Sequence, residues 1–255
     1  MKWWIGALSL LSMETVRAEN QIMKTMAVSP EYKVTGPLVS VVIPAYNEEN
    51  YLPALLSALK NQTYSNIEVI VVDNESTDNS VTVASNAGAK VITNHEFNLS
   101  MSRNMGAEAS KGNIIVFIDA DTVPESQAIE EVVNQMDLGY EMVRINTCCT
   151  DSHFQGMIRV LRGWTSLIHH AYGGAFIGVS RYAFDSVGGF DETVLVQDTP
   201  HIGEDKEFIR SVESMYPSTY LSNIYAGTSG RRQKVEGLTF SHRFQDRAIR
   251  QLEVK

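Results

Sequence analysis

An apolar run in the middle of the chain ends abruptly in two carboxylates. Residues 114–118 are followed at once by Asp119-Ala120-Asp121. Side chains two apart on an extended chain point the same way, so the two acids can hold one divalent cation or divide between a cation and a ligand hydroxyl. Acids at strand ends are also common helix caps and solvated loop residues, so this motif alone decides little.

The elements that position these acids alternate between strand and helix patterns. Apolar runs predict strands at residues 38–43, 67–72, 91–93 and 113–118. Helical spacing lies between them, as in residues 52–59, where leucines recur at intervals of three and four. Crossovers of this kind return the chain in the same direction, so we expect an α/β fold with a mostly parallel central sheet flanked by helices.

Residues that follow the first, second and fourth strands then gather at one edge, where open α/β sheets bind ligands. These residues are Tyr46, Glu48, Asp73, Asp119 and Asp121. The sequence therefore predicts a polar, acidic site at the carboxyl edge of the sheet.

The second half of the chain adds glycines and two further acids. Helical spacing is present at 129–136 and 154–168, and residues 142–145 resemble another strand. The glycine-rich passage 173–179, which includes Gly174, permits positive φ or close approach of a ligand, although turns alone also require glycine. Gly203-Glu204-Asp205 places two acids at the start of a helix, where plain capping is the alternative.

Composition narrows the class of protein. A chain of 255 residues is long enough for one large α/β domain, which we favour over two small ones. The formal net charge of -9 argues against a nucleic-acid binder, because no basic surplus exists to displace counterions from phosphates. The two cysteines, Cys148 and Cys149, are adjacent, so the fold does not rely on an ordinary disulfide.

Several segments, in order, resemble the motifs of the family 2 glycosyltransferases, nucleotide-sugar enzymes with the GT-A fold. The segments are residues 41–48, 71–78, 102–106, 119–121, 188–192 and 203–205. One such motif is weak evidence, whereas several in the family's order are specific. The resemblance covers roughly two-thirds of the chain and implies a single GT-A-type domain.

On the donor side, residues 41–48 are similar to the opening strand and nucleotide loop of the family. The resemblance implies donor contacts from Pro44, Ala45, Tyr46 and Glu48. Tyr46 would stack on the base, and the alternative is that it fills the loop.

Two further donor contacts are implied. Asp73 matches the family acid that contacts the base, and Arg103 lies in a segment similar to one that helps hold the nucleotide. Arg103 would donate charge-assisted hydrogen bonds to the diphosphate, and a surface salt bridge is the alternative.

Asp119-Ala120-Asp121 is similar to the Asp-x-Asp metal motif of the family. Asp121, with or without Asp119, is implied to hold Mg²⁺ or Mn²⁺, and Asp119 faces the ribose or the metal beside Ala120. A cation that bridges diphosphate oxygens neutralises the charge that develops on the leaving group, so no general acid is needed.

On the acceptor side, Asp205 matches the usual catalytic base of the family. It would take the proton of the acceptor hydroxyl as that hydroxyl attacks opposite the leaving group, which gives inversion. Glu204 is either a cap or an acceptor contact, and Gly174 belongs to the acceptor side.

The resemblance implies transfer of one sugar from a UDP- or GDP-linked donor to a glycan, lipid-linked or protein acceptor. We find no Gln-x-x-Arg-Trp after Asp205 and no apolar segment long enough for a polymer channel, which favours a non-processive enzyme. A nucleotide-sugar or glycan-binding protein without turnover is the alternative. A sugar nucleotidyltransferase is less favoured, because the first strand is not followed by a glycine- and arginine-rich triphosphate loop.

The expected organisation has three parts. Residues 1–36 form an N-terminal helical, apolar extension and linker, and residues 231–255 form a charged tail. The domain between them, 37–230, divides into a nucleotide-binding half to about residue 123 and an acceptor half from about residue 124.

The apolar residues 3–13 allow three interpretations. We rank a helix that lies on a membrane surface or packs on the domain first, a signal peptide second and a spanning helix last, because eleven residues are too few to cross a bilayer. The implied donor is a cytosolic metabolite, so we expect a cytoplasmic protein with peripheral contact to the membrane.

Overall fold

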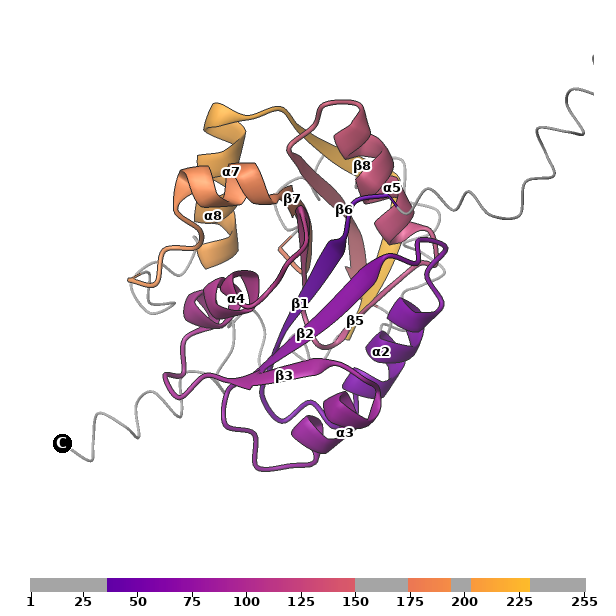
Figure 1. Cartoon of the computed structure of the whole chain (residues 1–255), viewed down its shortest axis with the longest axis vertical. Helices are drawn as coiled ribbons and strands as arrows, with labels where there is room; N and C mark the ends of the chain where they lie inside the picture. The colour runs from indigo at the N-terminus through magenta and orange to yellow at the C-terminus, as the bar shows by residue number, and fades with distance from the viewer. Residues whose placement is uncertain (1–35, 150–173, 194–202, 230–255) are drawn as a thin grey trace, which may run out of the picture. The chain divides into compact units, whose positions relative to one another are not determined.

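A computed structural model describes residues 36–149, 174–193 and 203–229, all within the unit Gly36–Lys255 (Figure 1). The expected N-terminal extension, the helix at 154–168 and the charged tail lie outside the described residues. The described elements, in chain order, are β1 (Val39–Ala45), α2 (Leu52–Lys60), β2 (Ile67–Asp73), α3 (Ser80–Asn86), β3 (Lys90–Thr93), α4 (Leu99–Glu108), β4 (Ile114–Ile118), β5 (Thr122–Pro124), α5 (Ala128–Asp137), β6 (Met142–Cys149), β7 (Phe176–Ser180), α7 (Arg181–Val187), α8 (Glu204–Met215) and β8 (Ser218–Thr228).

The strands form one sheet in the order β3-β2-β1-β4-β7-β6-β8-β5. Strands β3, β2, β1 and β4 are all parallel, and β6 is parallel to β8. Strand β7 runs antiparallel to both β4 and β6, and β5 runs antiparallel to β8. The expected α/β fold with a mostly parallel sheet is therefore confirmed.

Strand β1 is longer than the sequence predicts. Pro44, expected to close the strand, pairs with Val72 inside the β1–β2 ladder, and the strand continues to Ala45. Proline is tolerated because β4 pairs with β1 only as far as Val42, so no ladder on that side needs an N–H from residue 44.

The glycine-rich passage that we noted at 173–179 contains a strand. Gly178 lies in β7, and its φ is not positive. A Cβ there would lie 2.7 Å from Cγ1 of Val132, so glycine is needed for α5 to pack closely on the sheet. Strand β8 was not anticipated either, because its sequence is polar and its pairing with β6 shifts register at Ile145/Asn146.

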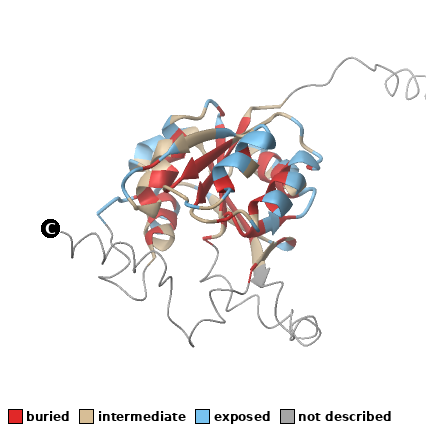
Figure 2. Ribbon diagram, turned by 90° about the horizontal axis from the view of Figure 1, so that it is seen from below, coloured by how far each residue is buried: buried red, intermediate tan, exposed pale blue. Residues whose placement is uncertain are grey.

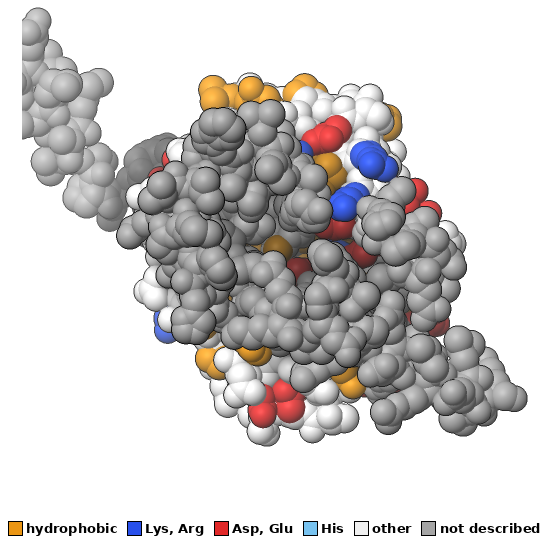
Figure 3. Space-filling model, turned by 180° about the vertical axis from the view of Figure 1, so that it is seen from behind, with side chains coloured by type: hydrophobic (Ala, Val, Ile, Leu, Met, Phe, Trp, Pro, Cys, Tyr) orange, Lys and Arg blue, Asp and Glu red, His pale blue; other side chains and the backbone are white. Residues whose placement is uncertain are grey.

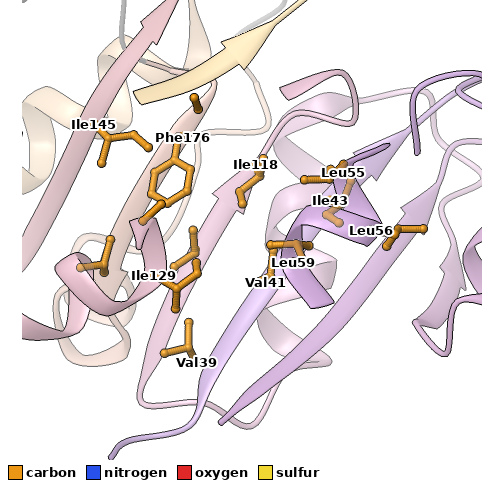
Figure 4. Close-up of a cluster of buried hydrophobic side chains, with 14 of the residues drawn as sticks. Val39, Val41, Ile43, Leu55, Leu56, Leu59, Ile118, Ile129, Ile145 and Phe176 are labelled. Atoms are coloured by element: carbon orange, nitrogen blue, oxygen red, sulfur yellow. The ribbon is translucent and has the colours of Figure 1, made fainter. Parts of the chain in front are cut away.

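Helices cover both faces of the sheet (Figure 1). Alternate residues of β1 divide between two cores, since Val41 and Ile43 belong to the cluster with α2 and α5, whereas Val42 belongs to the cluster with α4, α7 and α8. Figure 4 shows part of the first cluster, with Leu55 and Leu59 among the strand side chains. Both leucines are buried, and replacement of either by Ala is expected to cost about 2–5 kcal/mol of stability.

The second core is rich in phenylalanine. The rings of Phe190 and Phe208 stack with their centroids 4.1 Å apart, and Phe117 of β4 meets Phe190 edge to face at 5.0 Å. Phe184 of α7 joins the same group. These rings fix the start of α8 relative to the end of β4, and such pairs add roughly 0.5–1.5 kcal/mol each beyond burial.

The central strands are buried and the outer helix faces are exposed, as Figure 2 shows. Among the described helices, none combines the length and the apolar character needed to cross a membrane.

Candidate functional site

The acidic motif after β4 lies in a turn. The N–H of Thr122 donates to the carbonyl of Asp119 at 2.9 Å, and the N–H of Asp119 donates to the carbonyl of Ala175 at 3.1 Å. The expectation that the side chains of Asp119 and Asp121 point the same way assumed an extended chain, and residues 119–121 do not belong to a strand.

The two carboxylates accordingly have different partners. Asp121 is 5% exposed, and its Oδ2 accepts a hydrogen bond of 2.6 Å from the hydroxyl of Ser229, just beyond β8. Asp119 instead accepts 3.2 Å from Nη2 of Arg103. These different partners agree with the interpretation in which one acid holds a cation and the other contacts a ligand hydroxyl.

Arg103, on α4, is 3% exposed, so the alternative of a surface salt bridge is wrong. Its Nη1 donates to Oε1 of Glu204 at 2.9 Å, its Nη2 donates to Asp119, and its guanidinium carbon lies 5.1 Å from the ring centroid of Phe190. Burial alone would lower the pKa of Arg103, but Glu204 and Asp119 raise the pKa overall, which keeps the guanidinium charged.

The carboxylate of Asp205 packs against the backbone of two glycines, Gly174 and Gly203. A Cβ at Gly174 would lie 1.5 Å from Oδ2 of Asp205, and a Cβ at Gly203 would lie 2.5 Å from its Oδ1. The N–H of Lys206 donates to that Oδ1 at 2.8 Å. The group that lies close to the backbone of Gly174 is thus the carboxylate of Asp205.

The surroundings of Asp205 disfavour its ionised form. Burial raises the pKa of Asp205, adjacent Glu204 raises it further, and Arg103 lowers it in part. A carboxyl whose pKa lies above its usual range is better suited to accept a proton near neutral pH.

One acidic cluster therefore forms from four separate segments. It contains Arg103 of α4, Asp119 after β4, Glu204 and Asp205 of α8, and Gly174 before β7. Glu204 was expected as a cap or an acceptor contact, and in the structure its carboxylate pairs with the guanidinium of Arg103.

Asp73 lies at the same edge of the sheet, at the end of β2. It is 4% exposed, it pairs with Ala45 of β1, and its two carboxylate oxygens accept from the N–H of Ser76 at 3.3 and 3.1 Å. The next residue, Asn74, accepts 2.6 Å from the hydroxyl of Ser102, which precedes Arg103 on α4.

The sequence analysis did not single out Asn74 or Asn94 as residues that position the site. Nδ2 of Asn94 donates to Oδ1 of Asn74 at 3.2 Å and to Oγ of Ser102 at 3.0 Å, and both asparagines are buried. Buried amides at the ends of β2 and β3 are a signal for such a network, because they must find partners.

The loops after β1 and β2 are tied to each other. Oδ1 of Asn47 accepts 2.8 Å from the N–H of Thr77, and the N–H of Glu48 donates 2.7 Å to Oγ of Ser80. Asn47 has a φ of 53°, in the left-handed region that Asn tolerates better than most residues. Tyr46 packs edge to face on Phe97 with centroids 4.7 Å apart, which agrees with the alternative that it fills the loop.

The side chains present suit a cation that is shared with a ligand. Within the described residues, no three His, Cys, Asp or Glu side chains converge to hold a metal by themselves. Mg²⁺ is commonly held by one or two carboxylates together with substrate phosphates, so Asp121 fits such a site without a complete protein cage.

Charge is mixed on the face of the molecule in Figure 3, where described Lys and Arg side chains lie beside Asp and Glu side chains.

The fold and the acidic residues at the edge of the sheet are those of a known protein family. The model of glycosyl transferase family 2 matches residues 40–182, more than half of the chain, and the chain belongs to that family. The expected resemblance is thereby confirmed.

Curated relatives match part of the chain. An uncharacterised glycosyltransferase of Rickettsia prowazekii is 27% identical over 177 residues, which are 63% of this chain and 56% of the relative. The putative glycosyltransferase EpsH of Bacillus subtilis is 37% identical over 102 residues, 38% of this chain and 30% of the relative. The matches thus span less than two-thirds of these relatives.

Solved structures share the fold. The mannosyltransferase PcManGT of Pyrobaculum calidifontis, in complex with GDP-Man and Mn²⁺, has a TM-score of 0.59 at 18% identity, over 96% of this chain and 70% of that one. Residues 1–349 of TarS from S. aureus give a TM-score of 0.58 at 20% identity, over 76% and 61%. At this identity the likeness shows the fold alone, and it confirms the GT-A type of α/β architecture.

Proposed function

We propose that this chain is a metal-dependent, inverting glycosyltransferase that transfers a single sugar from a nucleoside-diphosphate sugar to an acceptor hydroxyl or phosphate. The observation that carries the proposal is the division of acids at the sheet edge. Asp121 is held by Ser229, and Asp205 lies in the separate cluster around Arg103. We infer that Asp121 serves the donor and that Asp205 accepts the proton of the acceptor.

The donor would lie across the ends of β2, β1 and β4. Asp73 would contact the base, Asp119 would face the ribose or the metal, and Asp121 would hold a cation beside the diphosphate. Family 2 membership supports this arrangement. It is also consistent with the GDP-Man and Mn²⁺ complex of PcManGT and the UDP-GlcNAc complex of TarS. When bound, Mg²⁺ or Mn²⁺ supplies charge neutralisation for the departing diphosphate.

Asp205 would act as the general base. Its raised pKa, its seat against Gly174 and its place at the start of α8 support this role. It accepts the proton of the acceptor hydroxyl while the oxygen attacks the anomeric carbon, and the diphosphate leaves from the opposite side. Because the acceptor oxygen attacks from the side opposite the diphosphate, the configuration at the anomeric carbon is inverted.

The proposal is tested by a screen of UDP- and GDP-sugars with Mn²⁺ or Mg²⁺ for release of the nucleoside diphosphate. Wild type is expected to release it and to attach one sugar to each acceptor molecule, and Asp205→Asn is expected not to. Donor binding without turnover in wild type would instead favour a binding protein, and release of pyrophosphate would favour a nucleotidyltransferase.

We also propose peripheral contact with the cytoplasmic face of a membrane through residues 3–13, where Trp3, Trp4 and the following apolar residues suit the interface. The full chain is expected to sediment with anionic lipid vesicles, and a chain that starts at residue 30 is not. Equal partition of the two into the supernatant would reject this contact.

A further inference from the structure

We infer that Arg103 is a positioning residue that anchors the helix of the catalytic base to the donor-side acid, and that it does not act as a contact for the diphosphate. This inference rests on the proposed function and deepens it. It also departs from the role that the sequence implies for Arg103, which was to hold the nucleotide.

The first argument is the geometry of the guanidinium. Its two terminal nitrogens reach carboxylates on different elements, 2.9 Å to Glu204 at the start of α8 and 3.2 Å to Asp119 after β4. Because the guanidinium is planar and rigid, two such bonds fix the distance and direction between the two acids. Asp205 follows Glu204 directly, so the bridge sets the position of the proposed base.

The second argument is the packing around Arg103. The guanidinium lies over the ring of Phe190, and Phe190 stacks on Phe208 of α8. The side chain is 3% exposed, and in the described part of the chain its Nε has no hydrogen-bond partner. The orientation of the guanidinium is therefore set by the two acids and the aromatic ring.

The third argument is charge. Asp119, Glu204 and Asp205 all act on Arg103, so three acids share one buried guanidinium. Without that cation, the acids at the start of α8 would repel one another, and the first turn of α8 would move away from Asp119. The expected defect is misplacement of Asp205 with an intact donor site.

The chain offers a matched control in Arg144 of β6. This arginine is also buried, its Nη2 pairs with Glu213 at 2.7 Å, and its guanidinium carbon lies 5.9 Å from the ring of Tyr220. It shares the chemistry of Arg103 but lies outside the proposed catalytic and binding residues. Arg144→Met therefore reports the general cost of removing a buried arginine.

The kinetic test compares Arg103→Met and Arg144→Met for KM of the donor and for kcat. Arg103→Met is expected to lower kcat by about 100-fold, the scale of a small misplacement of a reacting group, with little change in KM. Arg144→Met is expected to keep both values. A raised donor KM with normal kcat in Arg103→Met would identify a diphosphate contact and overturn the inference.

A double variant and chemical rescue with guanidinium ion provide two further tests of the bridge. In Arg103→Met/Glu204→Gln, the loss of kcat is expected to be smaller than the product of the single losses, because one of the opposed charges is gone. Added guanidinium ion is expected to restore kcat of Arg103→Ala in part. Strictly multiplicative losses, together with no rescue, would argue against the bridge.

Amide hydrogen exchange separates this inference from the proposed function. Exchange in residues 204–208 is expected to be faster in Arg103→Met than in wild type, and unchanged in Arg144→Met. If wild type turned over no donor, the proposed function would fail, and faster exchange confined to the start of α8 would still support the anchor. Unchanged exchange there would refute the anchor even in an active enzyme.

Discussion

At the scale of single residues, Asp205 shows how burial and neighbouring charges change the acidity of a carboxyl group. Burial raises the pKa of Asp205, and Glu204 adds to the effect, so the folded protein binds this proton more tightly than the unfolded chain does. The stabilisation from Asp205 is complete below its unfolded pKa of about 3.9 and is lost as pH rises through the raised folded pKa. At pH values above that folded pKa, the ionised carboxylate of Asp205 is therefore a cost to stability.

We expect Asp205→Asn to abolish transfer and to raise the melting temperature at pH 7, because the amide resembles the neutral acid and can keep the bond from Lys206. Scanning calorimetry at several pH values checks this prediction. The gain should shrink towards acidic pH, where wild-type Asp205 is itself protonated. A lower melting temperature at pH 7 would show that the ionised carboxylate is instead stabilising.

The same shift predicts the pH dependence of the reaction. The proposed base can accept a proton only when it is deprotonated, so kcat is expected to fall as pH decreases through the raised pKa of Asp205. The acidic limb of the profile should therefore lie above the ordinary range for aspartate, about 3.9. A profile that is flat down to that range would exclude Asp205 as the base.

Gly174 provides a further prediction, because a Cβ at this position would lie 1.5 Å from Oδ2 of Asp205. Gly174→Ala is expected to displace the carboxylate and to lower kcat to nearly that of Asp205→Asn, while circular dichroism stays native. Gly178→Ala is the control, since its Cβ would crowd Val132 at 2.7 Å instead. That variant should lose stability and keep kcat, and equal losses of kcat in both would contradict the assignment.

At the scale of elements, the sequence predicted what depends on local pattern. Strands β1, β2 and β4 and the leucine face of α2 follow from apolar periodicity, and α8 begins at Glu204 as expected. The mixed half of the sheet, β7 and β8, was not predicted, because its pairing depends on contacts distant in sequence and on a glycine that packs under Val132.

Some features of the site could likewise be predicted from the sequence, and others could not. That Asp73, Asp119 and Asp121 reach one sheet edge follows from strand order, which crossovers determine. The turn at 119–122, which separates the two acids, and the pairing of Arg103 with Glu204, 101 residues away, depend on tertiary packing and leave no local pattern.

The tie between the loops after β1 and β2 supports another prediction. Asn47→Ala removes the acceptor for the N–H of Thr77 and places a less tolerant residue at a φ of 53°. We expect a loss of roughly 1–3 kcal/mol in stability and a higher donor KM, with kcat at saturating donor nearly unchanged. Denaturant melts and steady-state kinetics measure both, and a drop in kcat alone would place this loop outside the donor site.

At the scale of the whole molecule, one sheet edge collects side chains from both halves of the chain. Strands β1, β2 and β4 bring the donor-side acids, and α8 brings the proposed base. The phenylalanine core and the ion pairs of Arg103 fix the position of α8 relative to the strands from the first half of the chain.

The central claim is that Asp121 serves donor and metal while Asp205 serves the acceptor. Its most direct test is calorimetric titration of a nucleotide sugar with Mn²⁺ into Asp121→Asn and Asp205→Asn, with wild type alongside. Asp205→Asn is expected to bind the donor as wild type does, and Asp121→Asn is expected to lose the Mn²⁺-dependent part of the affinity. Equal donor affinity in the two variants would contradict it.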